Sequence, residues 1–235
     1  MSAASTPLPD TTQRCRVCVA RAGCLFGQLP RAHLEKLDPQ IRELDFRKGE
    51  MLQTEGAQPP VVRSIKVGTV VLARTGPDGL SRPVAMVGRS HLLDVCSLVG
   101  SRALLSAQAL SAGRVCELPV AAVRSTLDKD PALLNALHQQ MGRSFESLAD
   151  WGHVMRMRGL PRQLVAALRL LTREQGTSAV LLPSQVALAA VLSTTRESVA
   201  RTLRQLEEDG HLLRRDRWHG ELTGTHPQIF RDAAA

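Results

Sequence analysis

The chain has 235 residues, a length that suits two modest domains better than one. Its hydrophobic fraction of 43% is enough for ordinary cores and excludes a chain that is disordered throughout. The formal net charge of +8 makes a polyanion the first partner to consider, whereas 3% aromatic residues and no tyrosine disfavour base stacking on single strands. No apolar run reaches the roughly 18–20 residues of a membrane span, and no signal peptide is recognisable, so we expect a cytoplasmic protein without membrane contact.

Five cysteines in a chain expected to stay reduced need an explanation other than structural disulfides. Cys15, Cys18 and Cys24 follow a C-x2-C-x5-C spacing, which places three sulfur ligands on one short segment. Thiolates select zinc, cuprous copper or an iron–sulfur cluster. A fourth ligand would come from Cys96 or Cys116. The alternative is a set of ordinary thiols or a C-x2-C redox pair, for which the usual βαβ context is missing.

After the cysteines, short helical patterns give way to strands and turns. Residues 34–37 and 41–44 have the spacing of short amphipathic helices. Residues 64–74 are rich in β-branched side chains, and residues 75–79 supply the chemistry of a hairpin turn. Further short strands are expected at 83–87, 107–110 and 114–118. Their spacing is typical of a sandwich or jelly roll.

A long helix is expected next, with Asp130 as its N-cap and Pro131 in its first turn. Apolar residues then recur at three- and four-residue steps, namely Leu134, Leu137, Met141, Phe145, Leu148 and Met155. This spacing resembles a coiled-coil seam and predicts a parallel homodimer, although a helix packed on its own domain also needs an apolar stripe. Residues 159–161 (Gly-Leu-Pro) end the pattern and predict a hinge.

The C-terminal segment has the pattern of a helix-turn-helix. Helices are expected at 164–171, at 185–192 after a cap at Ser184, and at 196–209 before a terminal Gly210. Residues 193–195 form the tight turn between the last two helices. Leu212, Leu213 and the arginine-rich residues 214–220 then predict the hairpin wing of a winged helix.

The last helix predicts contacts with double-stranded DNA. Its outer side, opposite an apolar face, carries Arg196, Glu197, Ala200 and Arg201. Arginine pairs with guanine, a carboxylate accepts a hydrogen bond from cytosine, and a small apolar side chain tolerates the thymine methyl. The alternative is that Thr194 and Glu197 form a capping box and that the arginines are only solvated.

These features together resemble the Crp/Fnr family of transcription regulators, and within it the Fnr-type oxygen sensors, over nearly the whole chain. The resemblance rests on the cysteine spacing and on matches at 48–50, 55–56, 107–110, 115–119 and 196–201. It implies that Cys116 is the fourth ligand of a [4Fe-4S] cluster held with Cys15, Cys18 and Cys24. Cys96 is then expected to be a small buried hydrophobe.

The resemblance implies an α+β fold in four parts. A cysteine loop at 1–30 precedes a β-roll or jelly-roll sensor domain, similar to cyclic-nucleotide-binding domains, at 31–128. A dimerisation helix with its hinge follows at 129–159, and a winged helix-turn-helix occupies 160–235. The implied function is that of an oxygen- or redox-responsive regulator whose cluster promotes dimerisation and binding to palindromic DNA at low oxygen. RNA polymerase is an expected partner.

Three departures from the family pattern affect these expectations. Ser193 stands where the family's turn has glycine, at a cost of about 1 kcal/mol if the backbone there is left-handed. The residues from Arg196 to Arg201 are closer to the Crp branch than to Fnr, so we expect a DNA half-site that differs from the usual Fnr one. Leu93-Asp94 and residues 104–106 replace the glycine and the arginine that hold a cyclic nucleotide phosphate, with Arg102 the nearest cation, so cAMP is not expected to bind.

Three other functions remain open from the sequence. A zinc- or disulfide-based redox regulator would use the same cysteines, and a Crp-type regulator could respond to a small effector instead. An enzyme is the least expected of the three, because G-x-S-x-G, H-E-x-x-H and P-loop motifs are absent from the sequence and its seven histidines are scattered.

Overall fold

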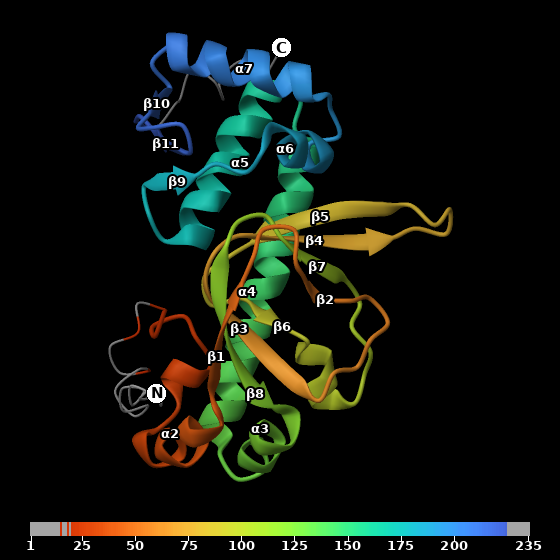
Figure 1. The fold of residues 1–235 in the computed structure, drawn as a ribbon, viewed down its shortest axis with the longest axis vertical. Coiled ribbons are helices and arrows are strands. Elements are labelled where there is room, and N and C mark those ends of the chain that lie inside the picture. Colours follow the sequence, from red (N-terminus) through yellow and green to blue (C-terminus); the bar gives the residue numbers. More distant parts are fainter. Residues whose placement is uncertain (1–14, 16–17, 19, 225–235) are drawn as a thin grey trace, which may run out of the picture.

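The computed structural model describes Cys15, Cys18 and residues 20–224, so the outer parts of the predicted first and last segments lie outside the described residues. A β-roll lies beside one long helix, and a smaller helical domain lies at one end of that helix (Figure 1). This architecture confirms the expected α+β class. Among the described helices, none is long and apolar enough to cross a membrane.

The β-roll consists of two four-stranded antiparallel sheets. The strand order in the first sheet is β1 (Arg42–Phe46), β8 (Gly113–Pro119), β3 (Val61–Val67) and β6 (Leu92–Leu93). The order in the second is β2 (Met51–Gln53), β7 (Ser106–Ala109), β4 (Val70–Thr75) and β5 (Ser81–Val87). The predicted strands are confirmed, except that the 64–74 run is broken at Gly68, whose φ of 109° suits glycine, and its two halves belong to different sheets.

One predicted helix in this half is wrong. Residues 41–44 belong largely to β1, whose Leu44 pairs with Val115 and whose Phe46 is buried. The partner strand comes from a distant part of the chain, and this pairing overrides the local helical spacing. The helices here are the 3-10 segments η1 (Phe26–Gln28), η2 (Asp38–Gln40) and η3 (Val95–Val99), and the α-helices α2 (Arg31–Leu37) and α3 (Val120–Leu127).

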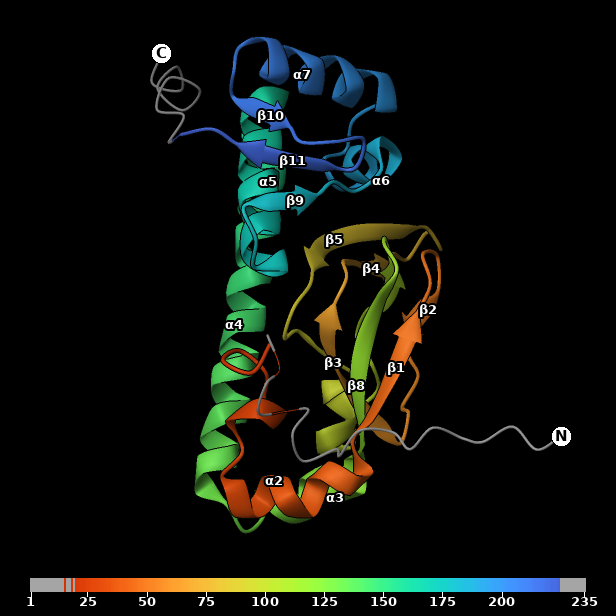
Figure 2. The ribbon, with the colours of Figure 1, turned by 60° about the vertical axis from the view of Figure 1, so that its left-hand side comes forward.

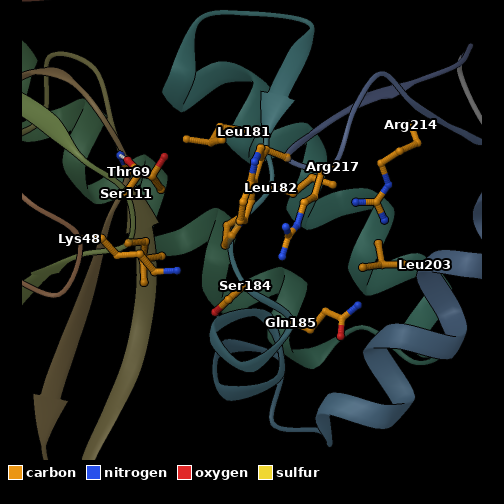
Figure 3. A pocket seen from close by; sticks show the side chains of 13 residues that line it. Lys48, Thr69, Ser111, Leu181, Leu182, Ser184, Gln185, Leu203, Arg214 and Arg217 are labelled. Carbon is orange, nitrogen blue, oxygen red and sulfur yellow. Dashed lines mark hydrogen bonds between the residues drawn. The ribbon is translucent and has the colours of Figure 1, made fainter.

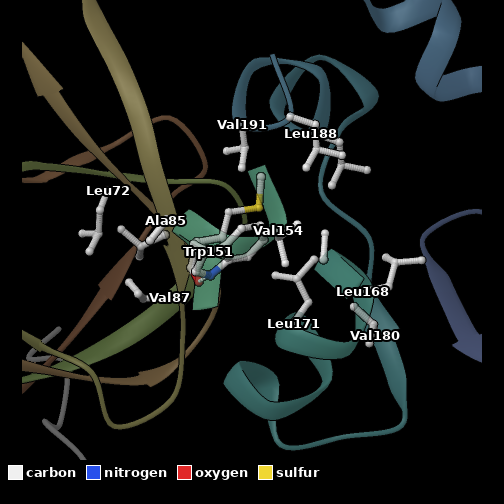
Figure 4. Packing of buried hydrophobic residues seen from close by; sticks show 14 of the residues in the cluster. Leu72, Ala85, Val87, Trp151, Val154, Leu168, Leu171, Val180, Leu188 and Val191 are labelled. Carbon is white, nitrogen blue, oxygen red and sulfur yellow. Dashed lines mark hydrogen bonds between the residues drawn. The ribbon is translucent and has the colours of Figure 1, made fainter. Parts of the chain in front are cut away.

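The long helix α4 (Pro131–Arg156) begins at the predicted cap, where Asp130 accepts a hydrogen bond from the backbone N–H of Ala132 at 2.9 Å. Trp151 is fully buried and donates its indole N–H to the carbonyl of Met86 in β5 at 2.9 Å. It lies between the β-roll and the C-terminal domain, within one continuous apolar cluster (Figure 4). The helix therefore connects both halves.

The C-terminal domain has the predicted winged-helix elements and one additional strand. Its helices are α5 (Leu160–Gln175), α6 (Gln185–Val191) and α7 (Arg196–Glu208). Its sheet has the order β10 (Leu212–Arg214), β11 (His219–Leu222) and β9 (Ala179–Leu181), and β9 was not predicted. Ser184 accepts a hydrogen bond from the Ala187 N–H and caps α6 as expected. Helix α7 lies at the far end of the molecule from α2 and α3 (Figure 2).

Candidate functional site

Helix α7 presents its predicted outer residues to solvent. Val199, Leu203 and Leu206 are buried and form its inner face. Arg196, Glu197 and Arg201 are exposed and Ala200 is half-buried. Among the described residues, neither arginine forms an ion pair. All four side chains predicted to contact DNA are therefore accessible to a partner.

The N-cap of α7 is one residue later than the capping-box alternative requires. Thr195, and not Thr194, accepts the hydrogen bond from the backbone N–H of Ser198, at 3.2 Å. The capping box of Thr194 with Glu197 is therefore wrong. Glu197 lies in the first turn, where its charge favours the helix, and its carboxylate stays in solvent.

The turn before α7 has the backbone that the family's glycine would suit. Ser193 has a φ of 51°, in the left-handed region, and its side chain is exposed. A serine in this conformation costs about 1 kcal/mol relative to glycine. The conditional expectation for Ser193 is thus confirmed.

The wing does not supply a simple excess of positive charge. From residue 196 to 221 the sequence has six arginines and six carboxylates. Arg214 pairs with Glu207 at 2.6 Å and Arg215 pairs with Glu221 at 2.5 Å, so two wing arginines are neutralised. Positive charge in this domain is therefore left at the arginines that lack a carboxylate partner. These include Arg196 and Arg201 on α7.

The four predicted cysteine ligands lie in one region of the structure. Cys15, Cys18, Cys24 and Cys116 all belong to, or pack against, one apolar cluster. Cys116 on β8 is paired across the sheet with Ser64 on β3, so the two side chains share a face. The Ser64 hydroxyl lies 3.4 Å from the Cys24 sulfur. The cysteine segment (Cys15, Cys18 and residues 20–24) thus contacts β3, the strand next to the one that carries Cys116.

The four cysteines are residues of the type that binds a soft metal centre, but the structure does not place them close enough together to share one. Burial, with smaller contributions from Cys24 and Glu43 nearby, raises the pKa of the Cys116 thiol to about 12. Burial thus disfavours the thiolate unless a cation replaces the proton. Over Cys15, Cys18 and residues 20–224, no three histidine, cysteine or acidic side chains are placed to hold a metal ion. Ligation would require the cysteine segment and Cys116 to approach one another.

Further hydrogen bonds tie the cysteine segment to α4 and to the turn after β5. Arg143 of α4 donates to the carbonyl of Gly23 at 3.3 Å, and the Ser90 hydroxyl donates to the carbonyl of Ala20 at 3.2 Å. The buried Gln140 amide of α4 donates to the carbonyl of Ser90 at 2.8 Å. The segment therefore contacts both α4 and the turn that follows β5.

That turn, residues 88–91, also holds the end of α5. The backbone N–H of Gly88 donates to the Glu174 carboxylate at 2.9 Å, and the N–H of Arg89 donates to the Glu174 carbonyl at 2.7 Å. Ser147 of α4 donates to the same carboxylate at 3.0 Å. Burial raises the pKa of Glu174, and this effect exceeds the lowering of the pKa by the hydrogen bonds from Gly88 and Ser147. Sequence reasoning missed this connection, because the groups of the 88–91 turn that bind Glu174 are backbone N–H groups, which leave no residue pattern.

An apolar cavity of about 220 Å³ lies between the β-roll and α4. Leu93, Leu105, Met141, Phe145 and Leu148 are among its lining residues. Asp94 also lines it, with one carboxylate oxygen buried without a hydrogen-bond partner in the described chain. Burial raises the pKa of Asp94 to about 6, although Arg63 lies at 2.6 Å. Among the described residues, no lysine or arginine lines this cavity.

Comparisons with known proteins agree on the C-terminal domain and on the fold. Residues 162–223 match the Crp-like helix-turn-helix domain family. A CRP-like cAMP-activated global transcriptional regulator of Mycobacterium tuberculosis is 28% identical over 200 residues, which are 82% of this chain and 88% of the relative.

Two solved structures share the fold at lower identity. FixK2 from Bradyrhizobium japonicum has a TM-score of 0.70 at 19% identity, covering 83% of this chain and 98% of its own. The c-di-GMP responsive global regulator CLP of Xanthomonas campestris has a TM-score of 0.63 at 15% identity, covering 83% of this chain and 100% of its own. At these identities the likeness concerns the arrangement of the chain, and the sensed signal has to be argued from this chain's own residues.

Proposed function

We propose that this protein is a DNA-binding transcription regulator of the Crp/Fnr family, and not an enzyme, and that it responds to oxygen through a [4Fe-4S] cluster. Cys15, Cys18, Cys24 and Cys116 would hold the cluster. When bound, the cluster supplies a centre that oxygen can dismantle. The observation that carries the proposal is that the cysteine segment shares one apolar cluster with Cys116 and accepts a hydrogen bond directly from Arg143 of α4.

The chain's own residues provide a route from the cysteines to DNA. Drawing the cysteine segment toward Cys116 would fix the carbonyls of Ala20 and Gly23, which accept from Ser90 and Arg143. Ser90 belongs to the turn whose Gly88 holds α5, so a fixed segment favours one placement of the DNA-binding domain. Release of the segment removes two acceptors and weakens that bias, which is a two-state coupling argument.

Dimerisation through α4 would complete the binding unit. Leu134, Met141 and Phe145, all from the predicted stripe, are 41%, 36% and 66% exposed in the single chain. Leu137 of the same stripe is buried within its own chain, so only part of the stripe is available to a partner. A parallel α4 pair would set two α7 helices about 34 Å apart, in successive major grooves of a palindrome. RNA polymerase would be the further partner at a promoter.

Anaerobic purification tests the cluster, with Cys116→Ser as the variant and Cys96→Ser as its matched control. We expect about four irons per chain in the wild type and in Cys96→Ser, and none in Cys116→Ser. A duplex selected from a random pool by the anaerobic protein should bind more weakly after exposure to air. A colourless anaerobic protein with one zinc would contradict the cluster and favour a zinc- or thiol-based redox regulator.

The cavity beside α4 supports a small effector as the second candidate function. Its lining is largely apolar, and the unpaired oxygen of Asp94 is suited to a ligand that donates a hydrogen bond. A phosphate there would meet a carboxylate and no lining cation, which supports the expectation that cAMP does not bind. An effector mechanism predicts ligand-dependent DNA binding that survives Cys116→Ser, and the iron mechanism predicts the opposite.

A further inference from the structure

A larger cavity lies where the β-roll meets the DNA-binding domain. It has a volume of about 400 Å³, within the range of sites for small molecules. Lys48, Thr69 and Ser111 approach from the β-roll, and Leu182 and Arg217 approach from the opposite side (Figure 3). Neither the cysteines nor the predicted DNA contacts of α7 line it. The cavity therefore has no role in the function proposed above.

Two cations at this cavity have no carboxylate partner in the described part of the chain. Lys48 and Arg217 are both exposed, and neither forms an ion pair there. Arg214, the third lining cation, is already bound by Glu207. The Thr69 hydroxyl is also occupied, since it accepts from Gln175 at 3.1 Å. The two cations without a carboxylate partner give the cavity a positive charge, which attracts an anion.

The cavity also contains a fixed aromatic surface. Trp218 is 55% exposed, and the Arg217 guanidinium lies over its ring at 4.8 Å from the centroid. The backbone holds this residue in place, because the Trp218 carbonyl accepts from the Leu182 N–H at 2.8 Å and its N–H donates to Asp216 at 2.6 Å. A planar ring can stack on the indole without displacing this support.

We propose that this cavity binds a small planar aromatic anion, a ring that carries a carboxylate, sulfonate or phosphate group. The ring stacks on Trp218 and packs against Leu182 and Leu203, while the acidic group pairs with Lys48 and Arg217. Because these contacts come from both domains, the ligand joins the β-roll to the winged helix at a point remote from the cysteines.

The test uses 8-anilinonaphthalene-1-sulfonate as the probe and the full-length protein. We expect Lys48→Gln and Arg217→Gln each to weaken its binding roughly tenfold, because each removes one charge-assisted contact. Trp218→Leu should weaken binding as well. Lys129→Gln and Arg124→Gln, which remove exposed cations at the distant α3 end, serve as matched controls and should bind as the wild type does.

Competition experiments then identify the acidic group of the ligand. Displacement by benzoate assigns a carboxylate ligand, displacement by benzenesulfonate a sulfonate ligand and displacement by AMP a phosphate ligand; displacement by none of the three would overturn the proposal. Equal affinity across all five variants, or a loss of binding in Phe145→Ser beside α4 instead, would also overturn it, since the probe would then occupy another surface. Circular dichroism spectra and thermal unfolding midpoints are measured for each variant, and only variants that match the wild type in both are compared.

Discussion

The DNA-reading helix and the cysteine region represent opposite ways of building a functional surface. Helix α7 is one continuous stretch that begins at its own cap, and the side chains predicted to contact DNA are accessible to solvent. The cysteine region joins an N-terminal segment to β3, α4 and the 88–91 turn, and its four predicted ligands are half-buried or buried. The first depends on neighbours in sequence, and the second depends on the whole fold.

Because the two regions differ in this way, substitutions in them should affect different properties, DNA affinity in one and stability in the other. A change on the outer face of α7 should alter DNA affinity with little effect on the free energy of unfolding. A change around the cysteine segment or its turn should alter packing, and DNA affinity only through the coupling between the halves. Three substitutions test this separation.

The largest effect is expected from Gly88→Ala. A Cβ at Gly88 would lie 2.5 Å from the carbonyl oxygen of Glu174, which is backbone and cannot turn away. We expect a loss of about 3 kcal/mol in the free energy of unfolding and a smaller difference in DNA affinity between anaerobic and air-exposed protein. Urea unfolding and anisotropy with a fluorescent duplex provide the two measurements.

Gly142→Ala is the matched control for that substitution. Gly142 lies within α4, and a Cβ there meets no atom within 4 Å. Alanine should therefore stabilise the helix by about 1 kcal/mol, the opposite sign. If both variants lost stability equally, the contact between the 88–91 turn and α5 would not be the cause.

Arg196→Ala tests the reading surface. Its guanidinium is exposed and has no ion pair in the described chain, so its loss should leave the unfolding midpoint nearly unchanged. Affinity for the selected duplex should fall about 30-fold, or about 2 kcal/mol, if the arginine contacts a guanine. An equal loss on unrelated duplexes would assign it to the phosphate backbone instead.

The smallest effect is expected from Ser193→Gly. The serine occupies a left-handed conformation, so glycine should raise the free energy of unfolding by about 1 kcal/mol. DNA affinity should stay the same, because the turn lies outside the α7 face. A loss of stability on thermal unfolding would show that the serine side chain contributes more than its backbone costs.

The sequence was sufficient for the parts of the fold that depend on local chemistry. The Asp130 and Ser184 caps, the hairpin turn at 75–79 and the glycine that ends α7 each have a signal within a few residues. Residues 41–44 were mispredicted because their strand pairs with β8, far along the chain. Helix α3 was missed because its apolar residues give no long stripe.

The two candidate sites also differ in how far the sequence predicts them. The exposure of Arg196 and Arg201 could be predicted from helical periodicity alone. The proximity of Cys24 to Ser64, and of Ser64 to Cys116, depends on strand register, which spacing between cysteines does not encode. The Thr195 cap differs by one residue from the predicted box, because threonine occupies both positions and only the backbone decides between them.

Helix α5 is held at both of its ends. Its first residue follows Gly159 and the end of α4, and its last turn is bound by the 88–91 turn through Glu174. The groups bound at Glu174, its carboxylate and its backbone carbonyl, lie off the helix axis, so they oppose rotation of α5 about that axis as well as its displacement. Helix α7 packs on α5. The 88–91 turn therefore restrains the outer helix of the C-terminal domain without touching it, through one intervening helix.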